Sequence, residues 1–168
     1  MDARKDETTG RNRTTMERTS DTEIVITRTF RAPPDIVFDA WTKPEHVRRW
    51  WAPASRGVTL VECDADVRPG GAYRYVLARG DTERYAFSGK YREIARPTRL
   101  VYTQSFEPMP GAAVVTVSFE ERDGSTVLVA HEVYPSKEAL DAALASGMEE
   151  GMRDTMDQLD ELVASLRR

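Results

Sequence analysis

The sequence has few of the features that mark a secreted or membrane-spanning protein. Its only cysteine is Cys63, so no disulfide can form within the chain. It has no apolar run near the roughly 20 residues that a transmembrane helix needs. The first residues also contain no apolar signal core. From these absences we expect a cytoplasmic protein that does not insert into membranes.

The charge balance and the missing motifs exclude further classes. The chain has 24 Lys and Arg against 28 Asp and Glu, a net charge of -4, whereas general nucleic-acid binding favours a basic surface. His46, Cys63 and His131 do not have the close spacing of metal ligands. The glycines match neither a phosphate loop nor a dinucleotide-binding fingerprint, and no GxSxG motif is present. We expect no metal, no cofactor and no nucleic-acid partner.

Composition divides the 168 residues into a tail and one domain. Residues 1–20 are polar and charged with almost no apolar side chains, which is typical of a disordered segment. Residues 21–168 contain no internal repeat and no interdomain linker. Their length is sufficient for a single domain with a hydrophobic core.

Residue periodicity predicts the order of the elements. β-Branched residues alternate over residues 22–31, which predicts a strand. Helical spacing follows, and Pro44 divides it into two short helices. Residues 58–133 read as short strands separated by turns, which implies an antiparallel meander because parallel strands need long crossovers. Residues 136–166 are predicted to form one amphipathic helix.

This order predicts an α+β fold in which a curved antiparallel sheet of about seven strands is covered by the C-terminal helix. A sheet with one buried face needs a cover, and only the last predicted helix is long enough to supply it. A sheet that wraps around a helix leaves a concavity between the two. Such a concavity suits a small apolar ligand.

Four stretches of the chain carry a resemblance to a known family: "ITRTFRAPPDIVFDAWTKPEHVRRWWAP", "FSGKYREIARPTRLVYT", "TVSFEERDGSTVLVAHE" and "GMEEGMRDTMDQLDELVA". They resemble the START-like (SRPBCC) superfamily, and within it the bacterial branch homologous to the C-terminal domain of the activator of the heat shock protein ninety ATPase. The resemblance implies a helix-grip fold, in which the sheet grips the C-terminal helix around a hydrophobic cavity. It implies function only broadly, since the superfamily includes lipid carriers, hormone-binding proteins, polyketide cyclases and chaperone regulators.

The C-terminal helix contains the first candidate ligand-binding residues, Met148 and Met152, and Met156 follows at the same spacing. Methionine is common at permissive binding surfaces. Gly147 directly precedes Met148, and Gly151 directly precedes Met152. A glycine inside a helix costs about 1 kcal/mol relative to alanine, so we expect a structural or functional reason for both. Either these glycines allow close approach to a ligand or to the sheet, or the stripe is ordinary core packing.

Aromatic residues on the predicted strands are the second group of candidates. The ligand-binding residues expected among them are Tyr75, Phe87, Tyr102 and Phe106. Their rings and hydroxyls would border a cavity for a mostly apolar ligand that carries one polar group. The alternative is that the rings themselves fill the cavity.

All three tryptophans lie in the stretch "WTKPEHVRRWWAP". Trp41 and Trp50 have a spacing that allows one buried face, so we expect them to anchor the short helices. Trp51 is expected at the rim of the cavity, where the resemblance places this segment. The alternative is that all three tryptophans belong to the core.

Two polar residues have no simple place in this pattern. His131 is a candidate ligand-binding residue and, with an ordinary pKa of about 6.5, a candidate general acid or base. The alternative for His131 is a structural, hydrogen-bonded role, and Glu132 should point to the opposite face of the strand. Arg28 falls on the apolar face of its strand, so either the strand twists there or Arg28 enters the pocket and meets an acidic group.

The predicted function is non-catalytic binding of a small hydrophobic or lipid-like molecule in the internal cavity. The resemblance offers two alternatives. One is a co-regulator of a chaperone ATPase, with a heat-shock chaperone as partner. The other is a cyclase- or hydrolase-like enzyme acting in the same cavity, for which the sequence identifies no catalytic residue. A homodimer is a further alternative that the sequence does not decide.

Overall fold

The structure is a computed structural model that describes residues 14–109 and 111–167. Its centre is one antiparallel sheet of eight strands in the order β1-β2-β8-β7-β6-β5-β4-β3. The strands are β1 (Thr15–Arg18), β2 (Glu23–Phe30), β3 (Val58–Ala65), β4 (Ala72–Arg79), β5 (Glu83–Ala95), β6 (Arg99–Phe106), β7 (Ala113–Arg122) and β8 (Ser125–Val133). The helices are α2 (Pro34–Thr42), α3 (Pro44–Val47), η1 (Ala54–Arg56), α4 (Lys137–Ala145) and α5 (Met148–Leu166).

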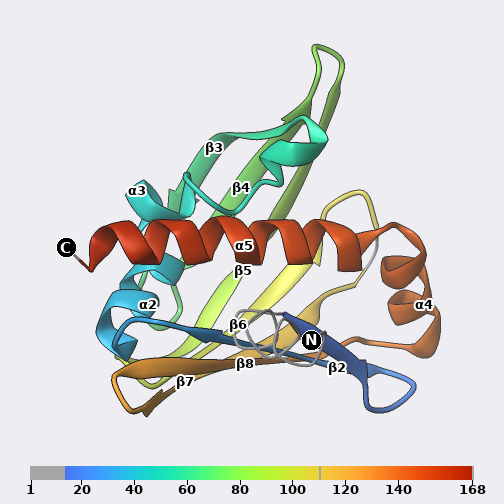
Figure 1. Cartoon of the computed structure of the whole chain (residues 1–168). Helices are drawn as coiled ribbons and strands as arrows, with labels where there is room; N and C mark the ends of the chain where they lie inside the picture. The colour runs from blue at the N-terminus through green and yellow to red at the C-terminus, as the bar shows by residue number, and fades with distance from the viewer. Residues whose placement is uncertain (1–13, 110, 168) are drawn as a thin grey trace, which may run out of the picture.

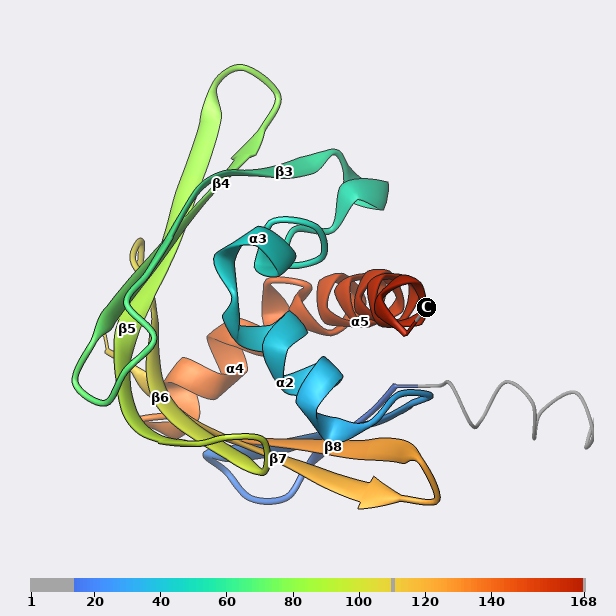
Figure 2. The same ribbon diagram turned by 90° about the vertical axis from the view of Figure 1, so that its left-hand side faces the viewer.

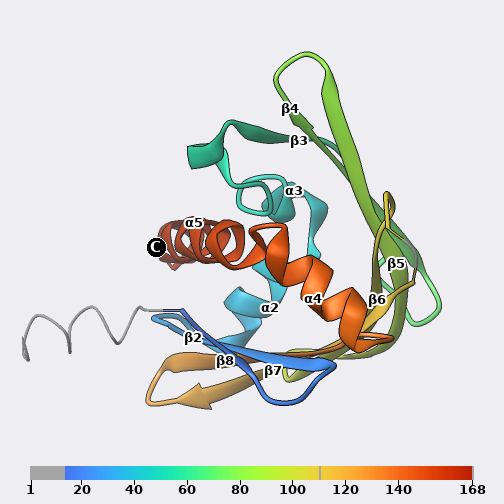
Figure 3. The same cartoon turned by 90° about the vertical axis from the view of Figure 1, so that its right-hand side faces the viewer.

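The sheet is curved, and helix α5 lies along its concave side (Figure 1). In the view along α5, strands β3 to β6 form one wall, while β2, β7 and β8 form a second wall at an angle to it (Figure 2). Helices α2 and α3 lie inside this bend, and α4 closes the opposite end of the molecule (Figure 3). The predicted α+β helix-grip fold is confirmed.

The folded domain begins earlier than composition predicts. Residues Thr15–Arg18 form the edge strand β1, which pairs antiparallel with β2. The buried Thr14 hydroxyl, just before it, accepts a hydrogen bond of 2.8 Å from Nη1 of Arg28. The prediction of a disordered tail is wrong for this strand, because four residues with one apolar side chain, Met16, give no periodic signal. Residues 1–13 lie outside the part of the chain that the structure describes.

The C-terminal helix is divided into two, where the sequence analysis predicts one. Helix α4 is capped at its start by Ser136, whose hydroxyl accepts a hydrogen bond from the backbone N–H of Ala139. It ends before Gly147, which has a φ of 87° in the left-handed region that glycine adopts at little cost. Helix α5 follows at once in a new direction (Figure 1). The turn between two helices therefore explains Gly147.

Arg28 lies on the inner face of β2 but beneath helix α5, away from the main cavity. Its side chain is 3% exposed, and Nη1 lies 2.7 Å from Oδ1 of Asp157. Its second amino group, Nη2, lies 3.6 Å from Oδ2 of Asp160. Both carboxylates belong to α5. The buried guanidinium therefore joins β2 to the acidic side of α5, which is a structural role.

Trp41 and Trp50 hold the short helices against the sheet, as predicted. Their ring centroids lie 5.0 Å apart, and the ring of Trp41 also contacts Phe119 of β7 at 6.3 Å. Nε1 of the buried Trp50 donates a hydrogen bond of 2.8 Å to the carbonyl oxygen of Ala40 in α2. This bond fixes α3 and the following turn against α2, and it positions the next residue, Trp51.

Candidate functional site

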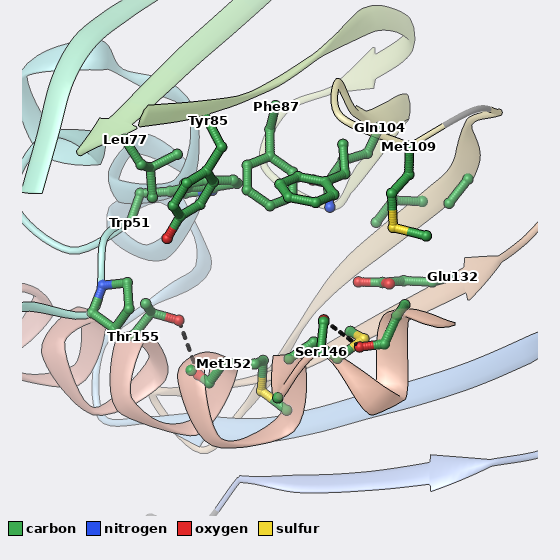
Figure 4. Close-up of a pocket in the computed structure, with 18 of the residues that line it drawn as sticks. Trp51, Leu77, Tyr85, Phe87, Gln104, Met109, Glu132, Ser146, Met152 and Thr155 are labelled. Carbon is green, nitrogen blue, oxygen red and sulfur yellow. Dashed lines mark hydrogen bonds between the residues drawn. The ribbon is translucent and has the colours of Figure 1, made fainter. Parts of the chain in front are cut away.

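A cavity of about 650 Å³ lies between the concave face of the sheet and helices α4 and α5. Its volume falls within the roughly 300–1,000 Å³ of small-molecule sites. The sheet contributes apolar and aromatic side chains, among them Ile26, Leu77, Tyr85, Phe87, Phe106 and Val115. The helices contribute Ala143, Met148, Gly151, Met152, Thr155 and Met156. Figure 4 shows the two sides facing each other across the open space.

Four tyrosines fill the part of the concavity next to this cavity: Tyr73, Tyr75, Tyr91 and Tyr102. The ring centroid of Tyr73 lies 5.0 Å from that of Tyr75 and 5.7 Å from that of Tyr102. Burial raises the pKa of each phenol above its ordinary value, so all four remain neutral. Tyr75 therefore belongs to a packed cluster and does not line the main cavity, while Tyr102 borders both.

Next to this cluster, where Trp51 contacts Tyr75, one end of the cavity keeps an open aromatic wall. The ring centroid of Phe87 lies 5.0 Å from that of Trp51 and 5.0 Å from that of Phe106. Trp51 comes from the turn after α3, and its ring covers the end of the cavity next to β5 (Figure 4). The structure thus brings together three residues that the sequence analysis assigns to the site. We call Trp51, Phe87 and Phe106 the aromatic end.

Met148 and Met152 line the helix side of the cavity, as the sequence analysis expects, and Gly151 lies between them. A Cβ atom built at Gly151 would meet no heavy atom of a neighbouring element within 4 Å. A close contact with the sheet is therefore not the reason for this glycine. The missing side chain instead leaves open volume in the cavity.

A buried carboxylate marks the end of the cavity away from Trp51 (Figure 4). Glu132 of β8 is 8% exposed, and its Oε1 accepts a hydrogen bond of 2.9 Å from the hydroxyl of Tyr134. Burial raises the pKa of Glu132, because loss of water penalises the charged form. We call Glu132 and Tyr134 the acidic end. The cavity therefore has an aromatic end and an end with a hydrogen-bond acceptor.

His131 lies outside the cavity, contrary to its prediction as a ligand-binding residue. Its side chain is 39% exposed on the convex side of the sheet, where Nε2 lies 2.7 Å from Oε1 of Glu23. The predicted alternation of His131 and Glu132 is correct, but the two faces are exchanged. Both faces of β8 carry apolar side chains, with Val127 and Val129 on one and Leu128 on the other, so alternation alone cannot identify the inner face.

Gln158 of α5 fastens the segment that carries Trp51. Its Nε2 donates hydrogen bonds of 3.0 Å to the carbonyl oxygen of Trp50 and 2.7 Å to that of Ala52. Its Oε1 accepts a hydrogen bond of 2.9 Å from the backbone N–H of Ala54. We call residues 50–56 the lid. The sequence analysis missed Gln158, because no local pattern shows that a helical amide meets backbone groups about a hundred residues away.

Replacing Glu132 by glutamine is expected to stabilise the protein at neutral pH. The folded-state pKa of Glu132 is raised above its ordinary value of 4.5, so the carboxyl contributes fully to stability below that value and its contribution is lost as the pH rises through the folded pKa. Glutamine keeps an acceptor for Tyr134 and has no charge to bury. Thermal unfolding from about pH 4 to about pH 8 should show a gap in Tm that widens as the pH rises. A gap that is independent of pH would contradict the buried carboxylate.

Two further classes of site have no counterpart in the described residues. Among residues 14–109 and 111–167, no three His, Cys, Asp or Glu side chains form a group that could hold a metal ion. No helix in the described part of the chain is both long enough and apolar enough to cross a membrane. The cavity is thus the site whose geometry supports a function.

Solved structures share this fold over almost the whole chain. A crystal structure of a protein from Rhodobacter sphaeroides has 27% sequence identity and a TM-score of 0.83, and the match covers 90% of this chain and 99% of that one. A crystal structure of a protein from Mycobacterium smegmatis has 28% identity and a TM-score of 0.77, with coverage of 89% and 96%. A solution structure of a protein from Staphylococcus epidermidis has 29% identity and a TM-score of 0.73, with coverage of 92% and 96%.

The chain matches one protein family over most of its length. The family model described as "Activator of Hsp90 ATPase homolog 1-like protein" matches residues 31–164. The match extends from just before α2 almost to the end of α5, so it includes the helices and the six strands β3 to β8. No curated protein matches the chain.

Proposed function

The chain belongs to the family of Activator of Hsp90 ATPase homolog 1-like proteins, and on this premise we propose that it binds a small, mostly apolar molecule in its cavity without transforming it. One observation carries the proposal. The space between sheet and helix stays open at about 650 Å³, although four tyrosines already fill the neighbouring part of the concavity. Well-packed interiors leave few voids larger than a water molecule, so an opening of this size is typical of a binding site.

The character of the lining supports an apolar ligand with one polar group. Rings at the aromatic end and methionines on α5 offer apolar surface on both sides of the space. Thioether side chains adapt to different ligand shapes. The acidic end offers a single buried carboxylate with a neighbouring phenol. Such a lining buries an apolar body and orients it by one polar contact.

Binding without catalysis is the simpler interpretation of these groups. A nucleophile in hydrogen-bond contact with a general base is the usual sign of covalent catalysis. The imidazole of His131, a candidate general base, lies on the convex side of the sheet. Glu132 makes its hydrogen bond with a phenol whose pKa is raised by burial, so that phenol is a poor nucleophile.

Titration with the neutral dye Nile red tests the proposal. We expect saturable binding of one dye per chain, with increased dye emission and quenching of tryptophan fluorescence, because all three tryptophans line the cavity. Loss of the signal on unfolding in urea serves as a control for adsorption. Absence of saturable binding, together with no small molecule retained in native mass spectra, would contradict the proposal.

The family description favours a second candidate, regulation of a chaperone ATPase. The chain contains the region that this family model matches, residues 31–164. An ATPase assay with a bacterial chaperone of the ninety-kilodalton heat shock class, with and without the chain, distinguishes the candidates. A changed ATPase rate together with a stable complex would support this second role, and an unchanged rate would leave ligand binding as the function.

A further inference from the structure

Only one of the two carboxylate oxygens of Glu132 accepts a hydrogen bond from the described residues. Oε1 accepts the hydrogen bond from Tyr134, whereas Oε2 has no hydrogen-bond partner among the described residues. Oε2 is not fully buried, and Glu132 lines the cavity, so this oxygen faces the open space. Figure 4 shows the carboxylate directed into that space. A side chain that is 8% exposed thus presents a free acceptor to the cavity.

The side chains packed around Glu132 provide no positive charge to compensate it. Its neighbours across the sheet are Ile24 on β2 and Val115 on β7. Helices α4 and α5 present alanines, Ser146 and methionines to the same space. The titratable groups that act on it are the phenols of Tyr134, Tyr102 and Tyr73 and, from the convex side of the sheet, the imidazole of His131.

The arginines of the lining lie on other elements. Arg56 lies in the lid, and its Nε is paired with Oδ2 of Asp154 at 2.7 Å. Arg79 and Arg84 lie on either side of the exposed turn between β4 and β5, at the aromatic end. The cavity thus has a buried carboxylate at the acidic end, whereas the aromatic end has exposed guanidinium groups together with the exposed carboxylate of Glu83. A ligand with an anionic head would meet repulsion at the acidic end.

We propose, building on the binding function above, that the cavity takes an amphipathic amine whose protonated amino group binds Oε2 of Glu132. The ammonium group donates to the carboxylate, and the phenol oxygens of Tyr134 and Tyr102 are further acceptors near it. The apolar body extends from the acidic end between Met152 and the rings of the aromatic end. A charge-assisted hydrogen bond at a buried position is stronger than one between neutral groups, so the amino group carries the selectivity.

Three probes of equal chain length test this inference: decylamine, decan-1-ol and decanoic acid, each displacing Nile red from the wild-type protein. We expect decylamine to bind at least about tenfold more tightly than either of the others, because it alone brings a cation to Glu132. The affinity for decylamine should fall as the pH is lowered, since protonation of the carboxyl removes its charge, whereas the affinity for decan-1-ol should not change.

Variants separate the role of Glu132 from general charge effects. Glu132→Gln should lose at least about tenfold of the affinity for decylamine and keep its affinity for decan-1-ol. Glu120→Gln, which removes the same charge from an exposed position on β7, should bind all three probes as the wild type does. The preference of the wild-type protein needs no variant, so the inference stays testable if Glu132→Gln does not fold.

The outcomes also separate this inference from the function on which it rests. Equal binding of decylamine and decan-1-ol, or a preference for decanoic acid, would overturn the amine and leave the binding function standing. If Glu132→Gln binds neither decan-1-ol nor decylamine, Glu132 maintains the cavity and does not recognise the amine. If neither Nile red nor any of the three probes binds the wild-type protein, the binding function itself fails.

Discussion

Replacing Gly151 by phenylalanine is expected to abolish ligand binding while the fold is retained. The new side chain would project into open volume, since a Cβ atom at this position meets nothing of a neighbouring element within 4 Å. Its ring would then occupy space that a ligand needs between α5 and the sheet. We expect the affinity for Nile red to fall by at least about 100-fold, because a ligand excluded by volume loses most of its contacts at once.

The same substitution should not lower the free energy of unfolding. Glycine in the interior of a helix is less favourable than other residues, and a change to alanine contributes about 0.5–1 kcal/mol. Gly151→Ala is therefore the matched control, since it gives the helical gain but adds only one methyl group to the cavity. It should bind the dye within about threefold of the wild type. If Gly151→Phe binds as tightly as Gly151→Ala, the ligand does not occupy the cavity.

Replacing Gln158 by leucine is expected to lower the free energy of unfolding by about 2–3 kcal/mol, because three hydrogen bonds to the lid are lost at roughly 0.5–1.5 kcal/mol each. Leucine has nearly the same volume, so packing changes little. The backbone groups of Trp50, Ala52 and Ala54 then lose their partner on α5. Urea unfolding followed by tryptophan fluorescence measures the effect, and the dissociation rate of Nile red should rise because Trp51 is held less firmly.

Asp154→Asn is the control for this second experiment. Oδ2 of Asp154 accepts hydrogen bonds from Ser55 and Arg56 in the same lid, but these contacts are exposed. Exposed ion pairs contribute about 0–1 kcal/mol, so this variant should change stability little. Equal losses in Asp154→Asn and Gln158→Leu would show that the amide of Gln158 has no special part in holding the lid.

Much of the fold follows from periodicity in the sequence. Alternation marks β2 and the strands between residues 58 and 133, and a helical stripe marks α5, because each repeats over enough residues to give a signal. Strand β1 is too short for such a signal, and its partner β2 stabilises it. The break at Gly147 is equally local, since one left-handed residue ends a helix without changing the apolar stripe on either side.

The site is less predictable than the fold, for reasons of packing. Phe87 and Tyr75 have similar patterns on neighbouring strands, and they are direct partners in the β4–β5 pairing. Phe87 nevertheless lines the cavity, while Tyr75 lies in the tyrosine cluster. Which ring fills space and which borders it depends on the helices above them. The inward position of Glu132 could not be predicted for a related reason, since its strand carries apolar residues on both faces.

Strand β1 has a consequence for any shortened form of the protein. Residue 21 is the start that composition suggests, yet a chain cut there would lack the strand that covers the outer edge of β2. The backbone N–H and C=O groups of β2 along that edge would then be free to pair with another molecule. An uncovered edge strand is a template for aggregation. Four polar-looking residues, Thr15–Arg18, therefore protect the protein from self-association, and solubility should depend on keeping them.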